Sequence, residues 1–262
     1  MSRSIPDHNA RAWDRAASAG GEWSRPVGPD VIERARRGDW SIILTPDKTV
    51  PRHWFPPSLA GVRVLALAGS GGQQVPVLAA AGADVTAFDI SENQLGLDRL
   101  VARREGLFIR TERGDMADLS RFADASFDLV VNPCSVCFVP EVNRVWREVA
   151  RVLKPGGRLM TGFLNPAFYL FDHDGEDDAA RRTAVFALPY RDDADDKRRA
   201  AIEAKGETLQ FSHTLSDLVG GQLRAGLRLV DLYEDHWPGS GIAIDAYMAC
   251  YLATLAERPE TA

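Results

Sequence analysis

The sequence predicts an α/β protein with a Rossmann-like, doubly wound sheet of seven strands, mostly parallel with an antiparallel last strand, plus helical lid elements. From residue 62 to about residue 160, short β-rich runs alternate with longer helical segments, which is typical of parallel strands covered by helices on both faces. Near the end of the chain, "LRLVDLYEDHW" at 227–237 and "DAYMACYLATLAE" at 245–257 follow each other as two successive strands. Two adjoining strands at this position favour an antiparallel edge.

Length and composition limit the kind of protein. The chain has 262 residues, of which 45% are hydrophobic and 26% charged, so one main domain with an appendage is expected. No apolar stretch approaches the roughly 20 residues that span a bilayer, and the N-terminus has no apolar segment typical of a signal peptide. We therefore expect a cytoplasmic protein that does not bind membranes.

The charge balance bears on the partners. Lys and Arg together number 31 against 37 Asp and Glu, a formal charge of −6, so the field of the molecule repels polyanions. Nucleic acid is an unlikely partner for that reason. We expect a small-molecule substrate and a monomer or homodimer.

The first β-rich run, at 62–69, leads into a glycine-rich turn in "VLALAGSGGQQ", residues 64–74. A glycine turn between a strand and a helix presents backbone N–H groups to a phosphate or carboxylate. The next strand ends at Asp89, 17 residues after Gly72, where a carboxylate can accept hydrogen bonds from ribose hydroxyls. A dinucleotide site has the pattern G-x-G-x-x-G, but counting from Gly69 the last position is Gln74, which argues against a dehydrogenase.

The second helix has a well-marked start. Ser91 with Gln94 three residues later forms a capping box directly after Asp89 and Ile90. The carboxyl end of the second strand is therefore well located.

The pair Cys134 and Cys137 has the C-x-x-C spacing of zinc and redox sites. The sequence offers no second pair to complete a tetrahedral zinc site, and Pro133 follows an apolar run that ends there. We interpret these cysteines as the end of a buried strand and predict no metal site. The acidic runs at 172–178 and 191–200 lack a calcium-loop spacing and are expected to be solvated.

Three further segments give the pattern its specificity: "GDMADL" at 114–119, "SFDLVV" at 126–131 and "RVLKPGGRLM" at 151–160 follow in that order. Together with the glycine loop and Asp89, they resemble the class I S-adenosylmethionine-dependent methyltransferases, in particular the small-molecule branch. The resemblance covers residues 60–165 well and residues 214–256 more loosely. It implies S-adenosylmethionine as the cofactor and S-adenosylhomocysteine as its product.

By this resemblance the glycine loop wraps the methionine part of the cofactor, Asp89 binds the ribose, and Asp115 accepts the adenine amino group beside Met116. Asn132 and Pro133 are expected near the sulfonium. The cofactor-binding residues that the resemblance implies are Ala68, Gly69, Ser70, Gly71, Gln74, Asp89, Ile90, Asp115, Met116, Asn132 and Pro133.

The chain departs from the family pattern at three places. Members commonly have an acidic residue at the position of Ala66, a glycine at Ala68 and a histidine at Cys137. Without the acid, Gln73 or Gln74 could act as neutral acceptors for the amino group of the cofactor. A degenerate cofactor-binding protein without activity is the alternative that these departures leave open, with an NAD-dependent oxidoreductase as the less favoured one.

The resemblance also divides the chain. Residues 61–164 are the S-adenosylmethionine-binding core, 1–60 an N-terminal lid or appendage outside the sheet, 165–212 an inserted lid segment, and 213–262 the C-terminal part of the core. Residues 1–60 hold four of the six tryptophans. Aromatic rings near a sulfonium can act as cation–π partners, although packing within a lid explains the same residues.

Methyl transfer from a sulfonium is an in-line displacement, so a base is needed only if the nucleophile must lose a proton. His213 and Tyr169 are the candidate catalytic residues, the histidine because its ordinary pKa suits a base near neutrality. A hydrogen-bonded structural role is the alternative for the histidine. The expected lid or substrate residues are Trp13, Trp23, Trp40, Tyr169 and His213. An aromatic-lined lid favours a planar substrate such as an indole or a phenol.

Overall fold

The computed structural model describes residues 4–173 and 177–260 and contains a seven-stranded sheet with the order β3-β2-β1-β4-β5-β7-β6. Strand β7 pairs antiparallel with both β5 and β6, and the other pairings are parallel. This confirms the predicted fold class. The strands are β1 (Arg63–Leu67), β2 (Asp84–Asp89), β3 (Ile109–Arg113), β4 (Phe127–Asn132), β5 (Leu153–Leu164), β6 (Arg228–Asp235) and β7 (Tyr251–Glu257).

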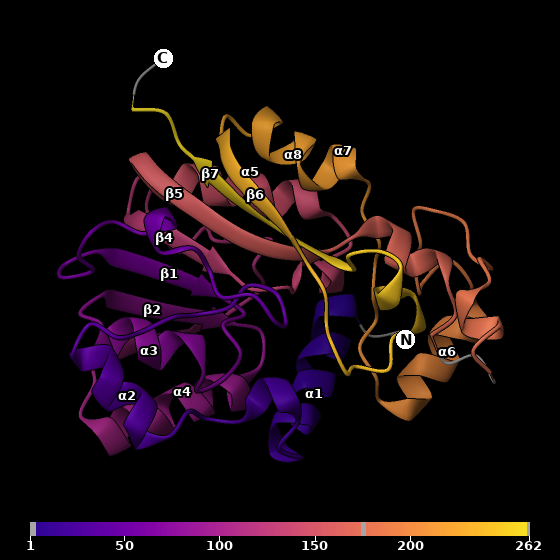
Figure 1. Ribbon diagram of the computed structural model, residues 1–262, viewed down its shortest axis with the longest axis horizontal. Helices are drawn as coiled ribbons and strands as arrows, with labels where there is room; N and C mark the ends of the chain where they lie inside the picture. The colour runs from indigo at the N-terminus through magenta and orange to yellow at the C-terminus, as the bar shows by residue number, and fades with distance from the viewer. Residues whose placement is uncertain (1–3, 174–176, 261–262) are drawn as a thin grey trace.

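Helices lie on both sides of this sheet, with α2, α3 and α4 grouped apart from α5, α7 and α8 (Figure 1). The helices are α1 (Ile5–Ser18), α2 (Pro29–Arg36), α3 (Gln74–Ala80), α4 (Glu92–Glu105), α5 (Val142–Val152), α6 (Asp196–Lys205), α7 (Leu215–Leu218) and α8 (Gly220–Arg224).

The alternation of side chains along β1 builds two separate hydrophobic cores. Leu65 and Leu67 pack in one cluster with α5 and its Trp146, whereas Val64 and Ala66 pack in the other with α3. Successive strand residues point to opposite faces, so a strand buried on both faces reads as a continuous apolar run. The order of the strands reverses between β1 and β4, which is where ligands bind in open parallel sheets.

The expected N-terminal lid divides into two parts. No strand of the sheet falls within the described residues 4–60, as predicted, but Ile42, Leu44, Trp54 and Phe55 are buried in the same hydrophobic cluster as β1 and α3. The segment around these residues therefore belongs to the core of the protein. Helix α1 and the turn after it lie outside this cluster.

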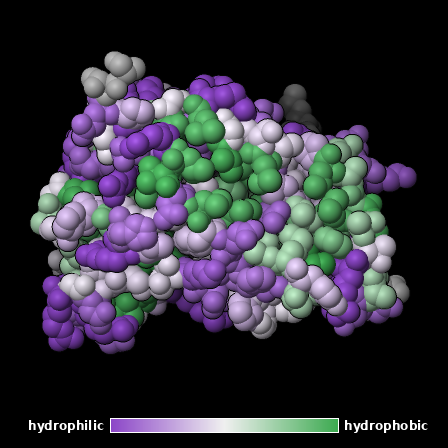
Figure 2. Space-filling view, turned by 45° about the horizontal axis from the view of Figure 1, so that its top comes forward, coloured by the Kyte–Doolittle hydropathy of each residue, from purple (hydrophilic) through white to green (hydrophobic). Residues whose placement is uncertain are grey.

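Residues 165–173 and 177–212 lie beside the sheet and contain helix α6 (Figure 1). This part of the chain exposes Val185 and Leu188, and hydrophobic side chains show on this side of the molecule as well as near the middle of the face in Figure 2. The acidic stretch at 172–178 lies partly outside the described residues. The last strand is shorter than predicted, because Ala243–Ala246 forms a 3₁₀ turn and pairing begins only at Tyr251.

Candidate active site

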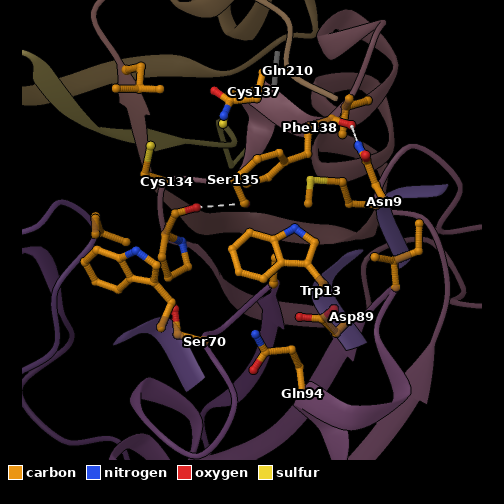
Figure 3. A pocket seen from close by; sticks show the side chains of 18 of the residues that line it. Asn9, Trp13, Ser70, Asp89, Gln94, Cys134, Ser135, Cys137, Phe138 and Gln210 are labelled. Carbon is orange, nitrogen blue, oxygen red and sulfur yellow. Dashed lines mark hydrogen bonds between the residues drawn. The ribbon is translucent and has the colours of Figure 1, made fainter. Parts of the chain in front are cut away.

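A cavity of about 320 Å³ opens at the carboxyl ends of the parallel strands. Residues that follow β1, β2 and β3 line one part of it, and residues that follow β4, β5 and β6 or begin β7 line the other. Helix α1 adds Asn9 and Trp13 to the wall, and Trp13 lies across the middle of the view in Figure 3. The two halves of the sheet thus contribute two ends of one space.

The glycine loop after β1 is bent by two residues in the left-handed region, Ala68 with φ 49° and Ser70 with φ 57°. Both line the cavity. An L-residue in this conformation costs roughly 1–2 kcal/mol, which the surrounding contacts must offset. Position 68, where a glycine is expected, thus has a left-handed conformation although alanine stands there.

Two amides of this loop are held from behind by α4. Gly71 N donates to Gln94 Oε1 at 2.9 Å, and Gly72 N donates to Asp98 Oδ1 at 2.8 Å. Among the hydrogen bonds of the described residues, none uses Gly69 N or Ser70 N. The expectation that the whole loop offers its amides to a ligand is therefore wrong for Gly71, and the donors left for an anion are those of Gly69 and Ser70.

Burial gives Asp98 an unusual ionisation. It raises the pKa of the Asp98 carboxyl to about 8, against the opposing effect of the Gly72 N–H. The carboxyl is also close to Asp89, whose negative charge acts in the same direction as burial.

The predicted capping box is half formed. Ser91 Oγ accepts from Gln94 N at 3.1 Å, as predicted. The side chain of Gln94, however, bonds Gly71 N and donates to Ser24 Oγ at 2.9 Å, instead of returning to the cap. The cap residue and the glycine loop are thus joined through one buried glutamine.

Asp89 ends β2 and lines the cavity, with its carboxylate beside Trp13 in Figure 3. Its Oδ1 accepts from Ser91 N at 2.8 Å. Burial raises the pKa of Asp89 to about 7, partly offset by the Ser91 N–H, and the charge of Asp14 raises it further. Near neutral pH this carboxyl group is therefore close to its midpoint of titration.

Asp115 lies after β3, where it forms a turn by accepting from Ala117 N at 2.9 Å. It lines the cavity together with Phe88, Ile90 and Met116. A carboxylate surrounded by apolar side chains in this way can select a flat ring that carries an amino group.

Helix α1 is fixed at both ends of the cavity. Asn9 Nδ2 donates to Phe138 O and Leu209 O, and Asn9 Oδ1 accepts from Leu209 N. Trp13 meets Phe138 edge-on with 5.2 Å between the ring centroids. The next residue, Asp14, accepts from Ser91 Oγ at 2.6 Å. The helix therefore connects the Asp89 turn to the opposite wall.

Trp23 lines the cavity, as predicted, and packs at 5.5 Å from Trp237. Trp40 does not. Its ring packs edge-on to Phe55 at 4.9 Å, under the guanidinium of Arg52 at 3.8 Å, within the sheet-covering segment. The expectation that Trp40 is a lid residue is therefore wrong.

The two candidate catalytic residues lie outside the lining. His213 is buried, and its Nε2 lies 3.1 Å from Val136 O. Burial lowers the pKa of His213, which keeps the ring neutral. Tyr169 lies one layer behind the cavity, where its hydroxyl donates to Gln210 Oε1 at 2.9 Å. Neither reaches the space where a nucleophile would bind.

Asn132 and Gln74, which were expected to bind the cofactor, also differ from expectation. Asn132 is buried and joins three strand ends, since its Nδ2 donates to Leu67 O and its Oδ1 accepts from Thr161 Oγ1. Pro133, the next residue, lines the cavity as expected. Gln74 also lines it, but its Oε1 accepts from Ile43 N at 3.0 Å, so the group it has left to offer is the Nε2 donor. Gln73 donates to Glu22 O instead.

The sequence analysis missed much of the wall that follows the second half of the sheet. Apart from Gln210, which lies between α6 and α7, these lining residues share a position after β4, β5 or β6 or at the start of β7. They are Cys134, Ser135, Cys137, Phe138, Leu164, Phe168, Gln210, Trp237, Ile242 and Tyr251.

Comparison with known proteins decides the family. Residues 65–161 match the model of the Methyltransferase domain family. Over 250 residues, 94% of this chain and 96% of the relative, the sequence is 46% identical to the uncharacterized methyltransferase YbaJ of Bacillus subtilis strain 168. The chain belongs to the S-adenosylmethionine-dependent methyltransferases. S-adenosylmethionine is therefore its cofactor.

Other relatives match this methyltransferase over about half of its length. It is 35% identical to a ubiquinone biosynthesis O-methyltransferase of Nitrosococcus oceani over 126 residues, which cover 47% of this chain and 53% of that one. A crystal structure of an S-adenosylmethionine-dependent methyltransferase from Mesorhizobium loti superposes with a TM-score of 0.63 at 24% identity, covering 79% and 95% of the two chains. This second likeness shows the fold. In the part of the methyltransferase that the structure describes, no helix has the length and apolar character needed to cross a membrane.

The pKa of Asp89 leads to a pH dependence that can be measured with 5′-methylthioadenosine, which has the ribose and adenine but no amino acid group. The carboxylate is the better acceptor for ribose hydroxyls, so binding should weaken as Asp89 becomes protonated. With a pKa of about 7, the ionised fraction at pH 6 is roughly one tenth of that at pH 8. We expect calorimetry to show about tenfold weaker binding at pH 6 than at pH 8.

Asp89→Asn serves as the control for this experiment. It removes the titration of Asp89 and keeps that of Asp98, whose pKa of about 8 lies close by. If the affinity of Asp89→Asn for 5′-methylthioadenosine does not change with pH, the pH dependence of the wild type is due to Asp89. An unchanged slope in that variant would assign it to Asp98 or another group.

Proposed function

We propose that this methyltransferase transfers the methyl group to a small aromatic molecule that is enclosed in the cavity beside the cofactor. The observation that carries the proposal is the single space that runs from Asp89 to Tyr251, with ionisable residues after the first strands and aromatic residues at the far end. A cavity of about 320 Å³ lies within the size range of small-molecule sites.

The lining fits the cofactor chemically. Asp89 would accept bonds from the ribose hydroxyls, and Asp115 from the adenine amino group, with Ile90 and Met116 against the ring. The backbone N–H groups of Gly69 and Ser70, which have no partner among the described residues, would donate to the carboxylate of the methionine part. When bound, the cofactor supplies an electrophilic methyl group on a positively charged sulfur.

The protein's own contribution to the chemistry is alignment and exclusion of water. Asn9 and Asp14 hold α1 over the cavity, so that Trp13 forms part of its wall. We propose that α1 acts as the cover of the site. Its contacts with the Asp89 turn would couple closure to cofactor binding.

The similarity to the ubiquinone biosynthesis O-methyltransferases supports the cofactor half of this proposal. Those matches cover about half of this chain. The nature of the acceptor is therefore argued from this cavity alone.

Methyl-labelled S-adenosylmethionine provides the test. The protein is incubated with a bacterial cell extract, and label is then measured separately in the metabolite, protein and nucleic acid fractions. We expect label in the metabolite fraction, and chromatography should place it on an aromatic compound. Asp89→Ala is the control for cofactor-dependent transfer. Label that collects in protein or nucleic acid would contradict the proposed acceptor class.

A further inference from the structure

The acceptor end of the cavity is walled by a hydrophobic cluster distinct from the two that pack on the sheet. Six of its members line the cavity, and we call this part the acceptor compartment: Cys134, Leu164, Phe168, Trp237, Ile242 and Tyr251. Figure 3 shows Cys134, Cys137 and Gln210 at the opposite end of the pocket from Ser70, Gln94 and Asp89. The six residues of the compartment thus differ from those expected to hold the cofactor, and Cys134 follows directly on Pro133.

Building on the proposed function, we infer that the acceptor binds in this compartment as an uncharged molecule and that the hydroxyl of Tyr251 orients it. Three observations carry this inference. They are the absence of cationic side chains from the lining, the polar atoms near the compartment that are already used, and the Tyr251 hydroxyl, which has no partner among the described residues.

The charge pattern comes first. Within residues 4–173 and 177–260, the cavity lining contains no lysine, arginine or histidine, and its carboxylates are Asp89 and Asp115. A carboxylate or phosphate on the acceptor would lose its hydration without gaining a cationic side chain of the protein. Burying an unpaired ion costs several kcal/mol or more. The compartment therefore selects against anionic compounds.

The nearest acid on this side does not change that result. Asp245 is absent from the lining, its Oδ2 accepts from Trp237 N at 3.0 Å, and its Oδ1 is 3.5 Å from His236 Nδ1. A hydrogen bond with Cys137 and burial raise the pKa of Cys134 above its usual range, and burial and the nearby thiols raise the pKa of Tyr251. The wall is therefore neutral near pH 7, and it offers no base to the acceptor.

Most polar side chains around this end are already engaged. Ser135 Oγ donates to Pro133 O and accepts from Asn132, and Asn9 is held by the backbone of Phe138 and Leu209. Gln210 Oε1 accepts from Tyr169. The Nε2 group of Gln210 is therefore a donor that an acceptor molecule can use in addition to a tyrosine hydroxyl.

Tyr251 differs from these residues. Its side chain is 6% exposed and lines the cavity, yet its hydroxyl has no hydrogen bond among those of the described residues. The ring is fixed by an edge contact with Trp237 and by its place at the start of β7, paired with Leu164. The hydroxyl of a tyrosine whose side chain is largely buried usually finds a partner. Here the molecule in the compartment would supply it.

Two compounds of nearly equal shape test the inference: 3-acetylindole, which is neutral, and indole-3-carboxylate, which is anionic. Both are titrated by calorimetry into the protein saturated with S-adenosylhomocysteine. We expect 3-acetylindole to bind at least about tenfold more tightly than the carboxylate. Tyr251→Phe should weaken the ketone by about five- to tenfold and leave the affinity for S-adenosylhomocysteine unchanged.

Tyr247→Phe is the matched control, because it makes the same chemical change at a side chain that is 73% exposed and outside the lining. Equal or tighter binding of the carboxylate would overturn the uncharged acceptor while leaving the proposed function in place. Equal affinity of wild type and Tyr251→Phe for the ketone would overturn the role of Tyr251. If neither compound binds, both the inference and the aromatic acceptor class are wrong.

Discussion

Asp89→Ala should abolish most of the affinity for S-adenosylhomocysteine, with a loss of at least about 100-fold. A carboxylate that accepts bonds from two ribose hydroxyls makes charge-assisted contacts worth roughly 1.5–3 kcal/mol each. The alanine variant loses both and leaves the hydroxyls facing an apolar wall of Trp13 and Ile90. Isothermal titration calorimetry at pH 8, where Asp89 is ionised in the wild type, measures the effect.

The fold must be intact for this result to have meaning. Asp89 also accepts from Ser91 N, so removal of its side chain disturbs the start of α4. Asp89→Asn keeps an oxygen for that bond and should retain part of the affinity. If both variants bind as tightly as the wild type, the ribose lies elsewhere and the assignment of the cofactor end fails.

The sequence predicted the core of this protein well, because the relevant signals are local. The apolar run before Gly69, the acid that ends β2 and the cap at Ser91 each depend on residues close together in the chain. Together they located the part of the cavity that lies at the carboxyl ends of β1 and β2. Parallel strands end at one edge of the sheet, so these local patterns were enough to bring their residues together.

The acceptor end was missed because its residues meet only through strand order. Tyr251 begins a strand, but β7 is antiparallel, so its first residue lies at the same edge as the last residues of β5 and β6. Trp237 follows β6 at that edge. The predicted antiparallel last strand already contained this information. Reading aromatic residues at the start of that strand as site candidates would have found Tyr251.

His213 and Trp40 show the opposite error. Each residue type suits a site, and neither position could be assigned to the cavity or the core from neighbours in the chain. His213 is fixed by a carbonyl 77 positions away, and Trp40 by Phe55 and Arg52 within the segment that covers the sheet. A residue type that suits a site was not enough to predict whether His213 or Trp40 lies in the cavity.

A second large effect is expected at Gln94, which is buried and serves two partners at once. Gln94→Leu keeps most of the side-chain volume but removes the acceptor of Gly71 N and the donor to Ser24 Oγ. Leaving buried polar groups without a partner costs roughly 1–3 kcal/mol each. We expect the free energy of unfolding to fall by about 2–4 kcal/mol, measured by denaturant titration.

The glycine loop should respond as well. Without its hydrogen bond to Gln94, the Gly71 peptide can rotate. The loop then samples several conformations, and only one of them presents Gly69 N and Ser70 N to the cofactor carboxylate. The affinity for S-adenosylhomocysteine should drop in Gln94→Leu, whereas the affinity for 5′-methylthioadenosine, which lacks that carboxylate, should change much less.

Ser24→Ala separates the two partners of Gln94, because it removes the Ser24 contact and leaves the Gly71 bond in place. We expect it to cost about 1 kcal/mol of stability and to leave both affinities near those of the wild type. If Gln94→Leu weakens both ligands equally, the glutamine supports the whole cofactor end through α4. If Ser24→Ala matches Gln94→Leu in its effect on S-adenosylhomocysteine, the contact with the N-terminal segment governs the loop, and the hydrogen bond to Gly71 is secondary.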